Sequence, residues 1–116
     1  MLYISDAFSF RMLSKPAATL WFRTLSMEEA KDLVDFHRKR ASCVGHQGLA
    51  RVLSNMLGVQ IQASTEGITL NKWDELMVAD YSGPPLRKGA RNLPEEAKIT
   101  FYEVGVINYY PPQRAL

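Results

Sequence analysis

The sequence lacks most of the features that place a protein outside the cytosol. Its one cysteine, Cys43, excludes an internal disulfide bond, which fits a reducing compartment. No run of about 18 apolar residues occurs, so we expect no membrane-spanning helix. Residues 1–10 carry no basic segment followed by a long apolar one, so no signal peptide is expected. These absences favour a protein of the cytoplasm.

Net charge is also low. A net charge of +2 is too small to predict nonspecific binding to duplex DNA, which requires several phosphates to be neutralised. Basic residues gather only locally, at residues 38–40 and at residues 87–91. With 47% hydrophobic and 22% charged residues in 116 positions, the composition is that of one ordinary globular domain.

Hydrophobic patterning predicts strands and helices in an irregular order. Ser26 and Glu29 form a capping box, which predicts a helix from there to about Arg40. A second helix is predicted over residues 47–57, and Gly58 follows it where a left-handed cap is needed. Strands are predicted over residues 2–4, 18–25, 41–44, 59–62, 67–70, 75–81 and 99–107.

This mixture predicts a single α/β domain over residues 1–107, with a mixed β-sheet flanked by helices. Residues 108–116 include Pro111 and Pro112 and are expected to form a C-terminal tail. Residues 82–94 contain several glycines and prolines and are predicted to be a loop. Because that loop is longer than most connections, it is a candidate lid or binding loop. In so small a chain, a dimer interface is a natural place for a site.

His46 is the strongest candidate for a catalytic residue. It lies beside Gly45, after a predicted strand and at the start of a predicted helix. A helix N-terminus presents free N–H groups and partial positive charge, which suit a bound phosphate. A histidine there can donate a proton to a leaving oxygen. The other interpretation is a helix-capping or surface histidine.

The remaining candidates concern metals and anions. Cys43 and His46 are too few for a zinc site, so we predict no metal and no cofactor. Ser9 follows the first predicted strand and can hydrogen-bond a phosphate or a sugar. Arg87 and Lys88 put positive charge on the long loop, which suits a lid that closes over an anion.

Several short segments occur in the order and spacing of one protein family. Ala7-Phe8-Ser9 and Gly45-His46 are the most telling of them. From Met1 to about Val106 the sequence resembles the viral ring nucleases, which are type III anti-CRISPR proteins, and their relatives in archaeal viruses and bacterial mobile elements. The matching segments are residues 2–4, 6–9, 12–13, 44–46, 57–59, 74–76, 86, 89 and 99–104.

The resemblance implies a homodimer that binds cyclic tetra-adenylate across its two-fold interface and cleaves it without a metal ion. A ribose 2′-hydroxyl attacks the adjacent phosphorus and leaves linear products with 2′,3′-cyclic phosphate ends. By this resemblance His46 is the general acid that protonates the leaving 5′-oxygen, and Ser9 contacts the ligand. The further ligand contacts that we predict are Asp6, Arg11, Gly45, Arg87 and Lys88.

Two other interpretations stay open. Asp6, Pro85 and Lys88 stand where the family usually has asparagine, arginine and glutamate. These departures motivate a catalytically altered binding protein, which sequesters a cyclic nucleotide or inhibits a host or CRISPR protein. The third interpretation is a DNA-binding dimer that uses the basic residues 38–40.

Overall fold

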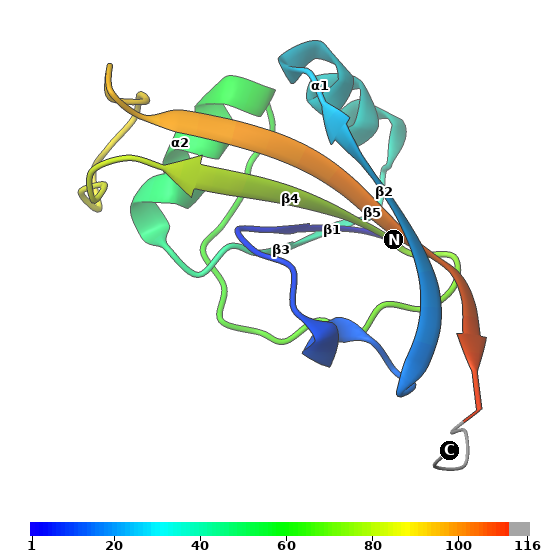
Figure 1. Ribbon diagram of the computed structural model, residues 1–116. Helices are drawn as coiled ribbons and strands as arrows, with labels where there is room; N and C mark the ends of the chain where they lie inside the picture. Colours follow the sequence, from blue (N-terminus) through cyan, green and yellow to red (C-terminus); the bar gives the residue numbers. More distant parts are fainter. Residues whose placement is uncertain (112–116) are drawn as a thin grey trace.

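The chain folds as a five-stranded β-sheet with two helices packed against one face, and Figure 1 shows a computed structural model of it. The structure describes residues 1–111. This arrangement confirms the α/β fold with a mixed sheet that the sequence predicts. In chain order the elements are β1 (Leu2–Ser5), the 3-10 turn η1 (Phe10–Met12), β2 (Ala17–Leu25), α1 (Met27–Phe36), β3 (Arg40–Cys43), α2 (Gln47–Leu57), β4 (Glu75–Ser82) and β5 (Lys98–Tyr110).

The strand order across the sheet is β2-β5-β4-β1-β3. β1 runs parallel to both β3 and β4, whereas β5 is antiparallel to β4 and to β2. At the end of β1, Ser5 aligns with Cys43 on one side and with Val78 on the other. The chain thus passes to one side of β1 and later returns to the other. In open α/β sheets, ligands bind outside the carboxyl ends of the strands at such a switch point.

The helices pack over one face of the sheet because each presents an apolar stripe. The predicted capping box is confirmed: the Ser26 Oγ accepts from the Glu29 N–H at 3.1 Å, and the Glu29 Oε1 accepts from the Ser26 N–H at 2.9 Å. Burying an aliphatic side chain stabilises the fold by about 1.5–3 kcal/mol relative to exposure. The largest fully buried side chains of this core are Leu2, Ile4, Val34, Val44, Val52, Leu53 and Met77.

The two helices end for different reasons. α2 ends as predicted at Gly58, whose φ of 72° is the left-handed conformation that glycine adopts without steric cost. α1 ends at Phe36, not near Arg40 as predicted, because the chain must turn there into β3. The Arg40 guanidinium donates to the carbonyls of Val34 and His37, at 2.7 and 3.0 Å, and so satisfies the end of the helix.

The opposite face of the sheet is covered by loops instead of helices (Figure 1). The predicted strands over residues 59–62 and 67–70 are wrong, since only the isolated bridges Val44–Ala63 and Leu13–Leu70 form there. Ser54 on α2 takes the place of a neighbouring strand, because its Oγ accepts from the Ile61 N–H at 2.9 Å. Loop residues therefore complete both cores: Ile61 packs into the core beneath the helices, and Ile68 and Leu70 pack on the helix-free face.

β5 is longer than the sequence predicts. It continues beyond residue 107 to Tyr110, which aligns with Ala17 at the start of β2. Side chains hold this extension: the hydroxyls of Tyr110 and Thr19 lie 3.0 Å apart, and the Tyr109 hydroxyl bonds the carbonyl of Leu70. Residues 108–110 thus belong to the sheet, and residues 112–116 of the predicted tail lie outside the described residues.

Candidate functional site

His46 lies where the sequence places it, between β3 and α2, just beyond the carboxyl end of β3. Its side chain is exposed, and its backbone is extended, with φ −100° and ψ 122°. The ring nitrogen Nδ1 accepts a hydrogen bond from the Leu49 N–H at 3.2 Å. His46 is therefore the N-cap of α2, the role given above as its other interpretation.

This hydrogen bond constrains the chemistry of the ring. A neutral imidazole that accepts at Nδ1 carries its proton on Nε2. The doubly protonated ring has no lone pair left for the bond, so His46 must release the Leu49 N–H before it becomes an imidazolium. An anion bound at the N-terminus of α2 would accept from the Leu49 N–H in place of the ring.

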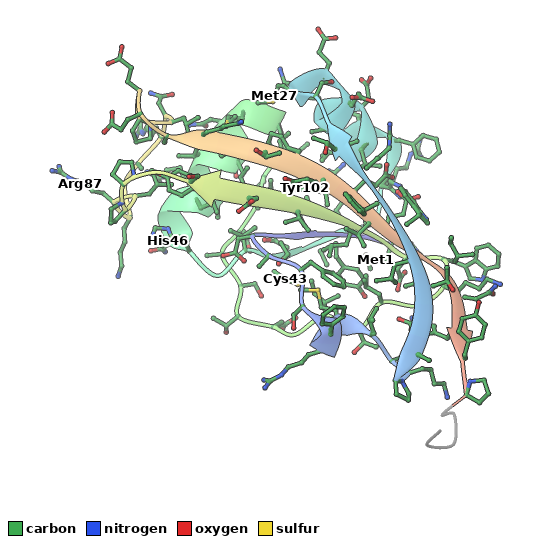
Figure 2. All side chains as sticks on the ribbon, viewed as in Figure 1. Met1, Met27, Cys43, His46, Arg87 and Tyr102 are labelled. Carbon is green, nitrogen blue, oxygen red and sulfur yellow. The ribbon has the colours of Figure 1, made fainter. Side chains whose placement is uncertain are left out.

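The long loop between β4 and β5 packs beside His46. Gly48 has no room for a side chain: a Cβ there would overlap the carbonyl oxygen of Arg87 and lie 3.0 Å from Cε1 of His46. Leu86 is buried and anchors this contact, whereas the side chains of Arg87 and Lys88 are exposed. Figure 2 shows His46 and Arg87 at the same end of the molecule. The structure therefore brings the basic loop to the N-terminus of α2.

Ser9 and Arg11 lie together in a separate pocket of about 250 Å³. The Ser9 Oγ caps η1 by accepting from the Arg11 N–H at 3.2 Å. The pocket opens at the carboxyl ends of β1 and β3, because Ser5 and Cys43 also line it. The predicted contact residues Ser9 and Arg11 thus share one site at the switch point.

Cys43 is the only thiol at this pocket, and its environment disfavours the thiolate. Burial, followed by the negative charge of Glu66, raises the pKa of the Cys43 thiol. A thiolate is the nucleophilic form of cysteine, so this residue is poorly suited to covalent chemistry. Cys43 contributes a small apolar wall instead.

Asp6 does not join Ser9 and Arg11. It lines a different hollow, of about 400 Å³, over β2, β5 and β4 on the helix-free face. Within residues 1–111, Asp6 makes no ion pair with Arg11. Gly45 is exposed, and a Cβ built there meets nothing within 4 Å, so open space lies beside His46. The predicted residues therefore occupy three neighbouring places and not one pocket.

Sequence reasoning missed a cluster of charged residues at the opposite end of the parallel strands. Glu103 is buried and accepts from the Arg23 Nε at 2.7 Å, and Arg23 also pairs with Glu29 at 2.9 Å. A hydrogen bond with Glu103, then burial, then the charge of Glu103 raise the pKa of Glu75 to about 7. The His37 Nε2 lies 3.4 Å from the Glu75 Oε2. Glutamates at inward-facing strand positions are the signal for such a cluster.

Burial, and then the positive charge of the N-terminus, lower the pKa of His37. This cluster is far along the sheet from His46, since Glu75 begins β4 beside Leu2. Among residues 1–111, no group of three or more His, Cys, Asp or Glu side chains is placed to hold a metal ion. The Arg23 guanidinium balances the charge of Glu103, whereas Glu103 beside it disfavours ionisation of Glu75.

The molecule is thus a small α/β protein built on a mixed five-stranded sheet, with an exposed histidine at the switch point. The sequence profile of the STIV B116-like family matches residues 2–109, and the chain belongs to this family. The solved structure of B116 of Sulfolobus turreted icosahedral virus superposes with a TM-score of 0.76 at 21% identity. That likeness covers 90% of this chain and 97% of B116, and it shows the shared fold.

A second relative comes from another archaeal virus. Uncharacterized protein 26 of Sulfolobus islandicus filamentous virus (isolate Iceland/Hveragerdi) is 30% identical over 77 residues. The match covers 66% of this chain and 64% of that protein. Both of these relatives are viral proteins. In the part of the chain that the structure describes, no helix is long and apolar enough to cross a membrane.

Proposed function

We propose that this protein binds and cleaves a cyclic oligoadenylate, cyclic tetra-adenylate in the first instance, in the cytoplasm of the host cell. The single observation that carries the proposal is the exposed imidazole of His46 at the switch point, beside open space at Gly45. Its ring caps the N-terminus of α2, where N–H groups and the helix dipole attract a phosphate. The resemblance to ring nucleases supplies the substrate class.

The proposed reaction needs only one protonated side chain. The ribose 2′-oxygen forms a bond to phosphorus while the bond from phosphorus to the 5′-oxygen breaks. The 2′-hydroxyl proton passes to water, and the His46 imidazolium gives its proton to the 5′-oxygen. The products are linear and end in a 2′,3′-cyclic phosphate. No metal ion enters these steps.

A homodimer is part of the proposal. The predicted contacts of one protomer are divided: Ser9 and Arg11 share one pocket, Asp6 lines another, and Arg87 lies on the loop beside His46. A cyclic oligonucleotide carries several phosphodiesters around one ring. Two copies related by a two-fold axis would present each set of contacts twice around such a ligand.

Binding without cleavage is the second candidate function, and one observation favours it. The Nδ1 of His46 accepts from the Leu49 N–H, so this hydrogen bond must break before the ring can act as the acid. If the ligand did not displace that bond, the protein would sequester a cyclic nucleotide without turning it over. Inhibition of a host or CRISPR protein is a further form of this candidate.

Product analysis tests both candidates. The purified protein is incubated with cyclic tri-, tetra- and hexa-adenylate in the presence of a chelator, and the products are resolved by chromatography. Linear products with 2′,3′-cyclic phosphate ends, made by the native protein and not by His46→Ala, are the expected result. Recovery of the same products from His46→Ala would overturn the role of His46. Intact ligand that co-elutes with the native protein would support sequestration.

A further inference from the structure

The loop between β4 and β5, residues 83–97, is closed at its base. The Tyr81 hydroxyl at the end of β4 donates to the Pro84 carbonyl. A Cβ built at Gly83 would lie 2.7 Å from the Cβ of Ala97, so the two ends of the loop lie against each other. Leu86 is buried in the core beneath the helices. The beginning of the loop is therefore fixed to the body of the fold, and the basic segment that follows depends on other contacts.

That basic segment is a turn with its charges outside. The Ala90 N–H donates to the Arg87 carbonyl at 3.0 Å, which closes a turn over residues 87–90. Arg87 and Lys88 lie in this turn, and their side chains are exposed. Neither makes an ion pair within residues 1–111. Their charges are therefore available to an anion.

α2 contacts this turn at both ends. At the first end, a Cβ on Gly48 would overlap the Arg87 carbonyl oxygen, so the backbone of the turn lies directly on the helix. Just after the turn, the Asn55 Nδ2 donates to the Arg91 carbonyl at 2.7 Å. Gly48 and Asn55 are seven residues apart, which is two helical turns on one face and about 10 Å along the axis. The turn therefore lies lengthwise along α2.

The two contacts constrain the turn in different ways. The Gly48 contact is one of packing and sets how closely the turn approaches the helix. The Asn55 hydrogen bond is directional and sets where along the helix the turn lies. α2 also carries His46 as its N-cap. One helix thus holds both the candidate acid and the basic turn.

We infer that Asn55 is a positioning residue for the proposed ligand site: its hydrogen bond fixes the turn on α2 and so keeps Arg87 at the end of the helix that carries His46. The inference rests on the proposed function, because the anion that meets the turn is a phosphate of the cyclic oligoadenylate. Without this bond the turn pivots on Gly48, and ligand binding must order it again. Ligand affinity then falls, whereas proton donation by His46 does not change.

Trypsin tests the hydrogen bond without any ligand. It cleaves after Arg87 and Lys88, so both bonds report opening of the turn. Asn55→Asp keeps the shape of the side chain but has an oxygen, which cannot donate, in place of the amide nitrogen. Cleavage at both bonds should become about three- to tenfold faster, because one hydrogen bond that opposes opening is lost. Asn92→Asp, at an exposed position of the same loop, adds the same charge and should be cleaved as the native protein is.

Steady-state cleavage of cyclic tetra-adenylate tests the positioning role. Asn55→Asp should raise KM about three- to tenfold, the same lost hydrogen bond, with kcat within about twofold of native. Asn55→Gln keeps an amide donor and should recover most of the affinity. Asn92→Asp again controls for the added charge and should leave both constants near native. A residue that only stabilised the fold would not separate KM from kcat in this way.

The outcomes separate this inference from the proposed function. If the native protein binds cyclic tetra-adenylate and Asn55→Asp binds it equally well, the inference fails and the proposed function stands. Equal trypsin cleavage of the two proteins, or a fall in kcat at constant KM, would also overturn the inference. If the native protein neither binds nor cleaves any of the cyclic adenylates, the proposed function fails and the positioning role fails with it.

Discussion

The two ends of the parallel strands differ in how their polar groups are satisfied. At the amino end of β4, Glu103 is paired with Arg23, and Glu75 lies 3.4 Å from His37 with its pKa raised to about 7. At the carboxyl ends of β1 and β3, the side chains of Ser9 and His46 each accept a hydrogen bond from a nearby backbone N–H. Groups already paired within the fold stabilise it, whereas groups paired only with nearby backbone are available to a ligand.

The largest effect is expected when the His46 imidazole, at the carboxyl ends of the parallel strands, is removed. In His46→Ala, the proposed cleavage of the cyclic oligoadenylate should fall about 10²- to 10⁴-fold, because the proposed general acid is lost. Stability should fall by about 1 kcal/mol, because α2 loses its N-cap. His46→Asn keeps a capping side chain and should lose cleavage alone. Initial rates and thermal unfolding measure the two effects, and normal cleavage by His46→Asn would show that the imidazole transfers no proton.

The next test concerns the contact between the basic loop and α2. Alanine normally stabilises a helix relative to glycine by about 1 kcal/mol, yet Gly48→Ala would force its Cβ against the Arg87 carbonyl. We expect a net loss of about 1–3 kcal/mol from this overpacking. Denaturant unfolding measures it. Gly89→Ala on the same loop is the control, since a Cβ there meets nothing within 4 Å, and a stabilised Gly48→Ala would show that the loop is not packed as described.

A smaller effect is expected where a loop replaces a strand. The Ser54 Oγ donates to the Ala50 carbonyl at 2.8 Å and accepts from the Ile61 N–H at 2.9 Å. Ser54→Ala leaves the Ile61 N–H without a partner and should cost about 1 kcal/mol. Ser14→Ala, at an exposed loop position, is the control and should change the free energy of unfolding little. Equal unfolding curves for both variants would mean that water replaces the hydroxyl.

The features that the sequence predicts are those that local chemistry determines. The capping box at Ser26, the glycine cap at Gly58 and the position of His46 before a helix each depend on a few consecutive residues. Neighbours in the chain are enough to satisfy their backbone groups. These elements of the fold, and the placement of the candidate acid, could therefore be read from the sequence.

The features that it does not predict depend on contacts between separate segments of the fold. Ile61 and Leu70 are residue types that favour strands. Their backbone groups nevertheless bond to side chains and not to a neighbouring strand: the Ile61 N–H bonds to Ser54, and the Leu70 carbonyl bonds to Tyr109. Asp6 and Ser9 both follow β1 yet line different hollows, and no local pattern encodes this separation. Contacts between separate segments decided the cases of Ile61 and Leu70.

The smallest effect is expected at the amino end of β4, where Glu75 titrates. The pKa of Glu75 is raised to about 7 in the folded chain, so the folded state holds a proton that the unfolded state releases near pH 4.5. Its contribution to stability is fully present below about pH 4.5 and is lost as the pH rises through 7. Glu75→Gln mimics the protonated form and should unfold at a temperature that depends less on pH across this window. Glu28→Gln, on the exposed side of α1, should keep the native pH profile, and an unchanged profile in Glu75→Gln would show that another group carries it.

The lowered pKa of His37 acts in the opposite sense, because its contribution to stability is lost as the pH falls. A decline in stability with rising pH that disappears in Glu75→Gln therefore identifies the carboxyl group, and not the imidazole, as its source.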